Sequence, residues 1–267
     1  MKLQGVPPAS KAKLKLYGKL HQKKHRDSEG LFLAEGLRTV RELVESLPEH
    51  DMLHALLFRE DEPAAAEFLS GFSGNVFTLT EKECMQLSQT TTPSGVFGVF
   101  LQQHSEGFRP ERAVGRSFLV ALDNVQDPGN VGTILRTASW FGADAMICGP
   151  GTADRYNAKA VRSSAGSIYA IAHYGVDVFQ AELARLAGAG YTVAASSLDG
   201  RDFREYVSWP EKLVLVIGNE ANGVSPGVLD MAHLLLKIPH AGDAPRVESL
   251  NASVSAGILM ERLVLQQ

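Results

Sequence analysis

The sequence predicts an α/β protein whose C-terminal part, residues 117–267, forms a mostly parallel sheet with helices on both faces. Strand-like and helix-like segments alternate along this part of the chain. Its strand-like segments are continuously apolar, which is typical of strands buried on both faces. Polar, glycine-bearing segments follow several of them, and ligands bind at the carboxyl ends of strands in such sheets. Together these patterns predict a doubly covered sheet with a site at one edge.

Short apolar runs separated by helical segments define the expected order of this part, because parallel strands need crossover connections. We expect strands at Phe118–Leu122, Ala145–Cys148, Ala170–His173, Thr192–Ser196, Val214–Ile217 and Leu234–Ile238. We expect helices at Asn130–Phe141, Ala158–Ala165, Val178–Ala187, Gly227–Ala232 and Ser249–Leu265.

Residues 31–101 mix helix and strand and predict a small N-terminal α/β domain. Its clearest helix covers Leu37–Leu47, where apolar residues recur at helical spacing. Residues 102–116 are polar, hold glycine and proline without periodicity, and predict a linker. The other expected elements are strands at Leu31–Ala34, Leu53–Phe58, Val76–Leu79 and Val96–Leu101 and helices at Pro63–Leu69 and Glu81–Leu87.

The composition, 45% hydrophobic and 21% charged, is ordinary for a globular protein of 267 residues, long enough for two modest domains. No apolar run approaches the roughly 18 residues of a membrane span, and the basic N-terminus lacks the apolar segment of a secretory signal. Cys84 and Cys148 lie far apart, which predicts reduced thiols in a cytoplasmic protein. The eight histidines show no ligand spacing, so we expect no metal.

Residues 1–30 form a basic N-terminal arm. Residues 1–26 hold eight Lys and Arg and no acid, whereas the rest of the chain holds 18 basic and 30 acidic residues. A cationic segment on an acidic body predicts local contact with a polyanion. The alternative is a solvated, partly disordered tail.

Three polar segments follow apolar runs and could meet at one edge of the sheet: residues 123–136, 216–223 and 239–256. In the first, Arg136 stands on a mostly apolar helix. Its guanidinium is a fork of donors suited to phosphate or a developing oxyanion. The alternative is a structural ion pair with Glu220.

The other polar residues of these segments could have purely structural roles instead of roles in a site. Asn130 could cap the helix that begins there, and Ser249 could cap the last helix. Glu220 could merely anchor its own loop. Asn251, expected one turn inside the last helix among small residues, has a weaker structural explanation.

An adenosine-type cofactor could be held by backbone groups and apolar walls near Gly218, Ile238 and Leu250. A turn glycine and core aliphatic residues are the alternatives. The chain lacks G-x-G-x-x-G and Walker A motifs, a G-x-S-x-G elbow and a Cys–His arrangement. The chemistry that remains is transfer of a group to an oriented acceptor, with electrostatic stabilisation by Arg136.

The three segments resemble, in order and spacing, the motifs of the SpoU/TrmH family of RNA ribose 2′-O-methyltransferases in the SPOUT superfamily. The resemblance covers residues 118–265. The N-terminal domain, with Glu35–Gly36 before an amphipathic helix, is similar to ribosomal proteins that bind kinked RNA. Residues 243–248 make the third segment longer than we expect in the family. The matching positions are Asn130 to Arg136 in the first motif, Gly218, Glu220 and Gly223 in the second, and Pro239, Gly242, Ser249, Leu250 and Asn251 in the third.

The resemblance implies a C-terminal trefoil knot that holds S-adenosylmethionine, and a homodimer whose site is completed across the interface. It implies that Arg136 acts on the ribose 2′-hydroxyl and its phosphate, while Asn130, Glu220, Ser249 and Asn251 build the pocket. The cofactor-binding residues it implies are Gly218, Ile238, Leu250, Ser197, Leu198, Asn219, Gly223, Pro239 and Gly242.

RNA is the partner that the resemblance implies, ribosomal RNA of the large subunit being favoured. If about five cations of the arm contact RNA, log affinity falls with log salt at a slope near −3.5. The alternatives are the same reaction on transfer RNA, a non-catalytic RNA-binding or ribosome-assembly factor, and an unrelated nucleotide-binding enzyme. The expected RNA-binding residues are Lys11, Lys13, Lys15, Lys19, Lys23, Lys24, Arg26 and Arg38.

Overall fold

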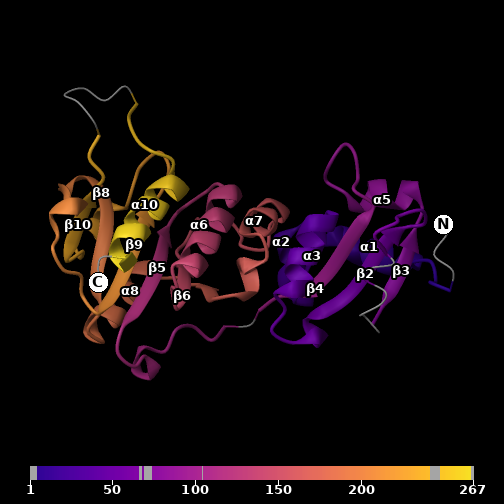
Figure 1. The fold of residues 1–267 in the computed structure, drawn as a ribbon, viewed down its shortest axis with the longest axis horizontal. Helices are drawn as coiled ribbons and strands as arrows, with labels where there is room; N and C mark the ends of the chain where they lie inside the picture. The colour runs from indigo at the N-terminus through magenta and orange to yellow at the C-terminus, as the bar shows by residue number, and fades with distance from the viewer. Residues whose placement is uncertain (1–4, 66–67, 69–73, 104, 241–246, 266–267) are drawn as a thin grey trace. The chain divides into compact units, whose positions relative to one another are not determined.

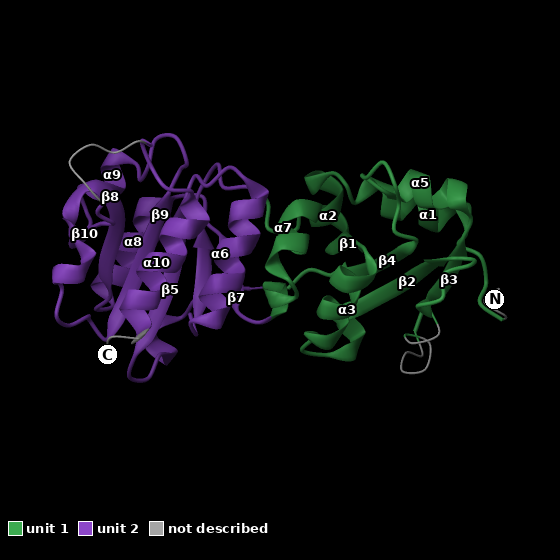
Figure 2. Cartoon of the chain, turned by 45° about the horizontal axis from the view of Figure 1, so that its top comes forward, with its two compact units in different colours: residues 1–103, 154–169 green, residues 104–153, 170–267 purple. Residues whose placement is uncertain are grey.

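The computed structural model describes the chain apart from residues 1–4, 66–67, 69–73, 104, 241–246 and 266–267 (Figure 1). The described chain forms two compact units (Figure 2). Unit 1 comprises Met1–Gln103 and Asp154–Tyr169, and unit 2 comprises His104–Ala153 and Ala170–Gln267. Residues 154–169, which we expected in the C-terminal domain, therefore pack with unit 1.

Unit 1 is built on a four-stranded sheet in the order β1-β4-β2-β3. The central strand β4 is antiparallel to both of its neighbours, and β2 and β3 are parallel. The strands are β1 (Leu31–Glu35), β2 (Leu53–Arg59), β3 (Val76–Leu79) and β4 (Val96–Leu101). The helices are α1 (Lys11–Lys19), α2 (Lys23–Glu29), α3 (Leu37–Glu45), α5 (Glu81–Leu87) and α7 (Ala158–Ser164).

Both faces of this sheet are buried because successive side chains of a strand point to opposite sides. On one face Leu31 and Leu33 pack with Tyr17 of α1 and Leu87 of α5. On the other face the ring of Phe32 lies against Phe100, Tyr156 and Tyr169, and its centroid is 5.0 Å from that of Tyr156. The two tyrosines flank α7, so this insertion from the later sequence completes the core of unit 1.

The basic arm is a folded part of unit 1 where the structure describes it. It forms α1 and α2, which we did not predict. Tyr17 is fully buried and Leu20 is 1% exposed. Apolar residues placed among lysines therefore anchor the arm, and the alternative of a disordered tail does not hold for residues 5–30.

Two of the short helices of unit 1 begin where sequence signals place a start. Thr80 accepts from the backbone N–H of Glu83, and Glu83 accepts from that of Thr80, a capping box that starts α5. Gly36 precedes α3 with φ of +105°, a conformation that favours glycine. Residues 66, 67 and 69 of the expected helix Pro63–Leu69 lie outside the described residues.

Unit 2 contains a six-stranded sheet in the order β10-β8-β9-β5-β6-β7, and every pair in it is parallel. This confirms the predicted parallel sheet. Its strands are β5 (Ser117–Asp123), β6 (Ala145–Cys148), β7 (Ala172–Gly175), β8 (Thr192–Asp202), β9 (Lys212–Gly218) and β10 (Leu234–Lys237). Its helices are α6 (Pro128–Trp140), α8 (Phe179–Gly188), α9 (Pro226–Leu229) and α10 (Ala252–Leu265).

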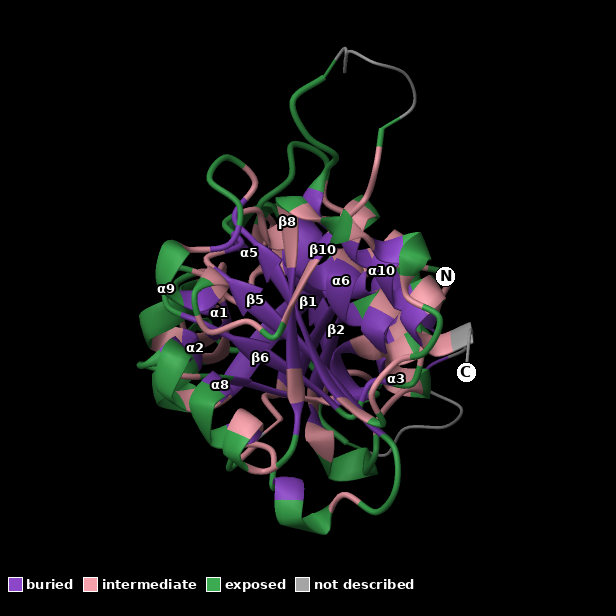
Figure 3. Cartoon of the chain, turned by 90° about the vertical axis from the view of Figure 1, so that its left-hand side faces the viewer, coloured by how far each residue is buried: buried purple, intermediate pink, exposed green. Residues whose placement is uncertain are grey.

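Helices cover both faces of this sheet, as predicted. Phe179, Leu183 and Leu186 of α8 pack on one face, together with Val228 of α9. On the other face α10 packs against α6 and β9. The strands are accordingly buried while the outer sides of the helices are exposed (Figure 3).

The strand order brings the predicted polar segments to one edge of unit 2. β9 lies between β8 and β5, so the ends of β5 and β9 are neighbours, and Asp123 pairs with Gly218. After β10, at the border of the sheet, the chain returns to its middle, where α10 packs. This path is consistent with the expected trefoil knot. No helix in the described ranges is both long and apolar enough to cross a membrane.

Candidate active site at the carboxyl edge of the C-terminal sheet

A cavity of about 860 Å³ opens in unit 2 at the carboxyl ends of β9 and β10 and along residues 196–199 of β8. This volume is within the range of small-molecule sites. Three large apolar side chains on its wall are exposed: Leu198 at 63%, Val247 at 66% and Leu250 at 45%. An apolar ligand surface would cover them. Of the expected site residues, Ser197, Leu198, Gly218, Asn219, Glu220, Gly223, Ile238, Pro239, Ser249 and Leu250 line it. The expected Gly242 lies outside the described residues.

A tight turn after β9 shapes one wall of the cavity. The backbone N–H groups of Asn219 and Gly223 each donate to the other's carbonyl at 2.9 Å. A Cβ on Gly218 would lie 2.2 Å from the backbone of Gly223 and Val224, so only glycine fits there. The Asn219 side chain holds the turn by accepting from the N–H of Ala221 at 2.9 Å.

Side chains from all three polar segments meet in one hydrogen-bond chain. The Nδ2 of Asn130 donates to Oε1 of Glu220 at 2.9 Å. The Nδ2 of Asn251 donates to Oδ1 of Asn130 at 3.0 Å. Both ends of the buried Asn130 amide are therefore used, which fixes its orientation. The three residues join α6, the turn after β9 and the start of α10.

Glu220 holds the first polar segment as well as its own loop. Its carboxylate accepts from the backbone N–H groups of Gln126 and Asp127, each at 3.2 Å. Burial by itself raises the pKa of Glu220. The hydrogen bonds from Asn130 and from these amides outweigh burial, so the pKa lies below its ordinary value. The ionised carboxylate thus links the loop after β9 to the segment that begins α6.

The helix starts differ from those the sequence predicts. Asp127, not Asn130, caps α6, with its side chain accepting from the N–H of Asn130 and Pro128 in the first turn. Ser249 does not cap the last helix, which begins at Ala252. Asn251 precedes that helix and accepts from the N–H of Ser253 at 2.9 Å, so it is a capping residue.

Arg136 does not lie in the cavity wall. It is exposed on α6, and the Glu220 carboxylate accepts from Asn130 and two backbone N–H groups, so the alternative of an ion pair between Arg136 and Glu220 is not seen among the described residues. Trp140, one helical turn further, is 84% exposed. On the neighbouring helix α10, Val254 is 51% exposed. A cation and large apolar side chains thus share the outer surface of two packed helices.

Residues 117–261 match the model of the SpoU rRNA methylase family, and residues 11–98 match that of the MRM3-like substrate-binding domain. The chain belongs to the SpoU rRNA methylase family. It is 32% identical to the 23S rRNA (guanosine(2553)-2′-O)-methyltransferase RlmP of Bacillus subtilis, across 98% of this chain and 99% of that protein.

Solved structures of the SpoU family share the fold of the whole chain. One from Porphyromonas gingivalis, assigned to the TrmH family, is 30% identical with a TM-score of 0.81, over 97% of this chain and 99% of that one. An rRNA methyltransferase from Sinorhizobium meliloti with bound S-adenosylmethionine is 31% identical with a TM-score of 0.78, over 97% and 96%. Family membership makes this chain an S-adenosylmethionine-dependent RNA 2′-O-methyltransferase, as the sequence predicts.

The cavity of this SpoU-family chain fits that cofactor. The exposed Leu198, Val247 and Leu250 offer apolar cover for an adenine ring, and the close turn at Gly218 leaves backbone groups at the wall. Ser197 and Asp199 supply hydroxyl and carboxylate oxygens on the same wall. No group of three His, Cys, Asp or Glu in the described ranges could hold a metal ion.

Several residues that organise the site carried no motif signal. Asp123, at the end of β5, accepts from the N–H of Ser225 at 2.7 Å. Asn124 adopts φ of +59°, and its carbonyl accepts from Nδ2 of Asn219 at 2.8 Å. A polar pair directly after a buried strand is the only signal that could have indicated them.

The expected RNA-binding residues lie in unit 1 and differ in availability. Lys11, Lys15, Lys19 and Lys24 are exposed. The prediction that Arg26 binds RNA is wrong. Its side chain is 4% exposed and pairs with Asp154 inside unit 1, so it is not available to a phosphate. The remaining members have local partners: Lys13 lies over the ring of Phe77, Lys23 pairs with Asp27, and Arg38 pairs with Glu42.

Proposed function

We propose that this chain methylates one ribose 2′-hydroxyl of large-subunit ribosomal RNA, as a homodimer in the cytoplasm. The single observation that supports the site most strongly is the chain of hydrogen bonds joining Asn251, Asn130 and Glu220 beside the cavity. The ribosomal substrate is supported by the similarity to the 23S rRNA methyltransferase over nearly the whole length of both chains.

The cavity residues provide the binding and orientation that this reaction needs. S-adenosylmethionine, when bound, supplies an electrophilic methyl group. The turn at Gly218 and the walls at Ile238 and Leu250 would hold its adenosine end. Asn130, Glu220 and Asn251 would keep the loops around it in one arrangement, so that little reorganisation is needed when the acceptor arrives.

Arg136 would act on the acceptor. Because a guanidinium stays protonated in proteins, it is unsuited to be the base. It would bind the phosphate next to the reacting ribose and stabilise the forming alkoxide, while the proton leaves to phosphate or water. Arg136 is exposed and absent from the wall of its own cavity, so we propose that it serves the cavity of the partner protomer.

Methylation of purified RNA tests this function. The protein is incubated with labelled S-adenosylmethionine and with unmodified ribosomal and transfer RNA, and ribose methylation is mapped by nucleotide. One new 2′-O-methyl group in large-subunit RNA is expected. Methylation of transfer RNA alone would favour the first alternative. Cofactor binding without transfer to free RNA or ribosomal particles would favour a non-catalytic factor.

Substitution of Arg136 tests its role separately. Arg136→Ala should bind S-adenosylmethionine normally and lose at least about 100-fold in turnover, since a charge-stabilising group of this kind contributes that much. Arg112→Ala, at an exposed arginine outside the cavity wall, is the control. A near wild-type rate for Arg136→Ala would refute the role.

Mixed dimers distinguish action within one protomer from action across the interface. Arg136→Ala is mixed with Asn251→Ala, each inactive alone. If Arg136 serves the partner's cavity, a mixed dimer regains one working site, and statistical mixing restores about a quarter of the wild-type rate. No recovery, with dimers exchanging normally, would mean that each arginine serves its own protomer.

A further inference from the structure

Unit 1 contains a cavity of its own, of about 170 Å³. This is well below the roughly 300–1,000 Å³ of sites that enclose a whole ligand. It has room for one heterocyclic ring system, while anything attached to that ring must lie outside. The cavity is formed by the turn after α1, the end of β1, the segment after α5 and the first turns of α7.

The floor of this cavity is formed by apolar residues that are packed into unit 1. Leu33 is 6% exposed, Ala34 2%, and Leu87 and Val161 1% each. Leu33 and Ala34 belong to β1, Leu87 to α5 and Val161 to α7, so the packing of unit 1 sets the position of these residues. Such a surface suits the flat face of a heterocycle better than a charged group.

The rim carries groups that can recognise a base edge. Gln89 is exposed and offers an amide with both donor and acceptor atoms. The Nε2 of His21 donates to the carbonyl of Leu87 at 2.9 Å, which leaves Nδ1 as an acceptor. Burial, foremost, lowers the pKa of His21, so the ring is neutral near pH 7. These two rim groups can therefore distinguish ligands by the hydrogen-bond donors and acceptors of a base edge, not by the charge of the ligand.

One side of the opening is positively charged. Lys159 and Arg162, from the first turns of α7, line the cavity and are exposed. The guanidinium fork matches the oxygens of a phosphate. A phosphate attached to a nucleoside whose base occupies the cavity would lie at this opening.

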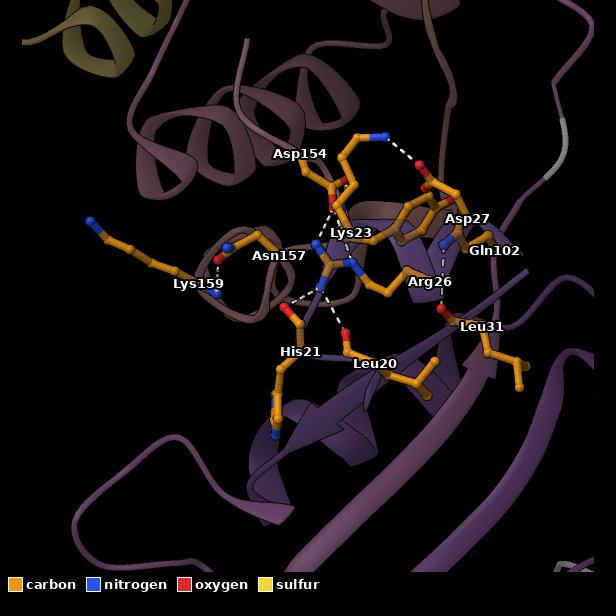
Figure 4. Close-up of polar contacts among 11 residues, drawn as sticks. Leu20, His21, Lys23, Arg26, Asp27, Leu31, Gln102, Asp154, Asn157 and Lys159 are labelled. Atoms are coloured by element: carbon orange, nitrogen blue, oxygen red, sulfur yellow. Dashed lines mark hydrogen bonds and ion pairs between the residues drawn. The ribbon is translucent and has the colours of Figure 1, made fainter. Parts of the chain in front are cut away.

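Buried polar contacts hold the walls before any ligand arrives. Arg26 donates to the carbonyls of Leu20 at 2.7 Å and His21 at 2.8 Å, and it pairs with Asp154, just before α7 (Figure 4). This one side chain thus ties the His21 wall to the α7 wall. Asn157 then caps α7 by accepting from the N–H of Lys159 at 2.9 Å.

Glu35 organises the remaining wall. Its carboxylate accepts from the hydroxyl of Ser88 at 2.7 Å, from that of Thr90 at 3.3 Å and from the N–H of Ser94 at 3.3 Å. These bonds hold the segment that carries Gln89. Among the described residues of the lining, Glu35 is the only carboxylate, and these hydrogen bonds engage it, so it opposes an anionic ligand less.

We propose that this cavity binds one extruded nucleotide of the RNA substrate, with its base on the apolar floor against Gln89 and a neighbouring phosphate on Arg162. That the ligand is RNA rests on the proposed function. The size favours RNA over a free metabolite, because the cavity encloses only a ring and leaves the backbone outside. Sequence-specific RNA readers commonly take up unstacked bases in this way.

Binding of in vitro transcribed large-subunit RNA to three variants tests the proposal. Ala34→Leu fills the cavity and should weaken binding about tenfold or more, as loss of a buried base does. Gln89→Ala should weaken it about fivefold without changing the slope of log affinity against log salt. Arg162→Gln should weaken it and make that slope shallower by about 0.7. Gln86→Ala and Lys82→Gln, exposed on α5 and outside the lining, are the matched controls.

The same RNA is made with 4-thiouridine and irradiated in the complex. Crosslinks to peptides holding residues 87–90 or 157–162 support the site. Wild-type affinity in both Gln89→Ala and Arg162→Gln, which are surface changes that should not disturb folding, would overturn it even if Ala34→Leu misfolds. Wild-type methylation with those unchanged affinities refutes only this cavity, whereas intact RNA binding without methylation refutes the proposed function.

Discussion

At the scale of single residues, the site depends on polar groups whose hydrogen bonds are made within the protein. Asn130 uses both ends of its amide, and Glu220 collects one amide side chain and two backbone N–H groups. An ionised carboxylate held this way is stabilised against protonation. Its contribution to folding must therefore depend on pH.

Glu220→Gln should lower the free energy of unfolding near pH 7 and have little effect in acid. The folded pKa of Glu220 is depressed, so its stabilisation is complete above the unfolded value of about 4.3 and is lost as pH falls through the folded pKa. Urea unfolding of wild type and variant at both pH values measures this. Glu261→Gln, on the exposed side of α10, is the control. An equal difference at both pH values would contradict the account.

Arg26→Met should cost about 3–5 kcal/mol of stability, since it leaves the carboxylate of Asp154, whose side chain is 15% exposed, without its cation. Adding Asp154→Leu should recover part of the loss, because no lone charge then remains. Lys23→Met is the matched control: its pair with Asp27 is exposed and contributes within about 0.5 kcal/mol. Chemical denaturation measures all of them. Equal small effects for Arg26 and Lys23 would mean that burial does not distinguish the two pairs.

At the scale of elements, short turns between strand and helix position the cavity more than the helices do. The turn from Gly218 to Gly223 folds back so closely that its own backbone occupies the place of a side chain. Gly218 is therefore a steric requirement of the fold, and Gly223 adopts φ of +69°, which favours glycine. The turn also places Glu220 within hydrogen-bond distance of Asn130 on α6.

Gly218→Ala should destabilise unit 2 by about 1–3 kcal/mol and weaken S-adenosylmethionine binding, because the turn must open to admit a methyl group. Calorimetric titration and thermal unfolding measure the two effects. Gly188→Ala is the control, since a Cβ there meets no atom within 4 Å. Unchanged cofactor affinity in Gly218→Ala would show that the turn does not shape the cavity.

At the scale of the whole molecule, exposed apolar side chains lie on α6, which also carries Arg136, and on α10, which begins directly after Asn251. Large apolar side chains exposed on two packed helices are candidates for an interface. A dimer formed there would bring a second Arg136 toward the cavity region. Association and turnover should then be lost together.

Trp140→Glu should yield a monomer that still binds S-adenosylmethionine but has lost turnover, because a buried carboxylate opposes association. Light scattering after size exclusion, cofactor titration and the methylation assay give the three readouts. Val114→Glu, at a side chain that is 95% exposed in the connecting segment, is the control. A dimeric Trp140→Glu protein would place the interface elsewhere.

The sequence by itself determined the parallel sheet, most strand positions and the polar segments at its edge, because apolar runs and polar strand ends are local patterns. The meeting of Asn130, Glu220 and Asn251 required the tertiary structure, since they lie about 90 and 120 residues apart. The packing of residues 154–169 with unit 1 and the burial of Arg26 were also decided only there. The sequence alone does not distinguish a buried arginine from an exposed one. The burial of Arg26 depends on Asp154, which is distant in the sequence and is brought next to it only by the tertiary structure.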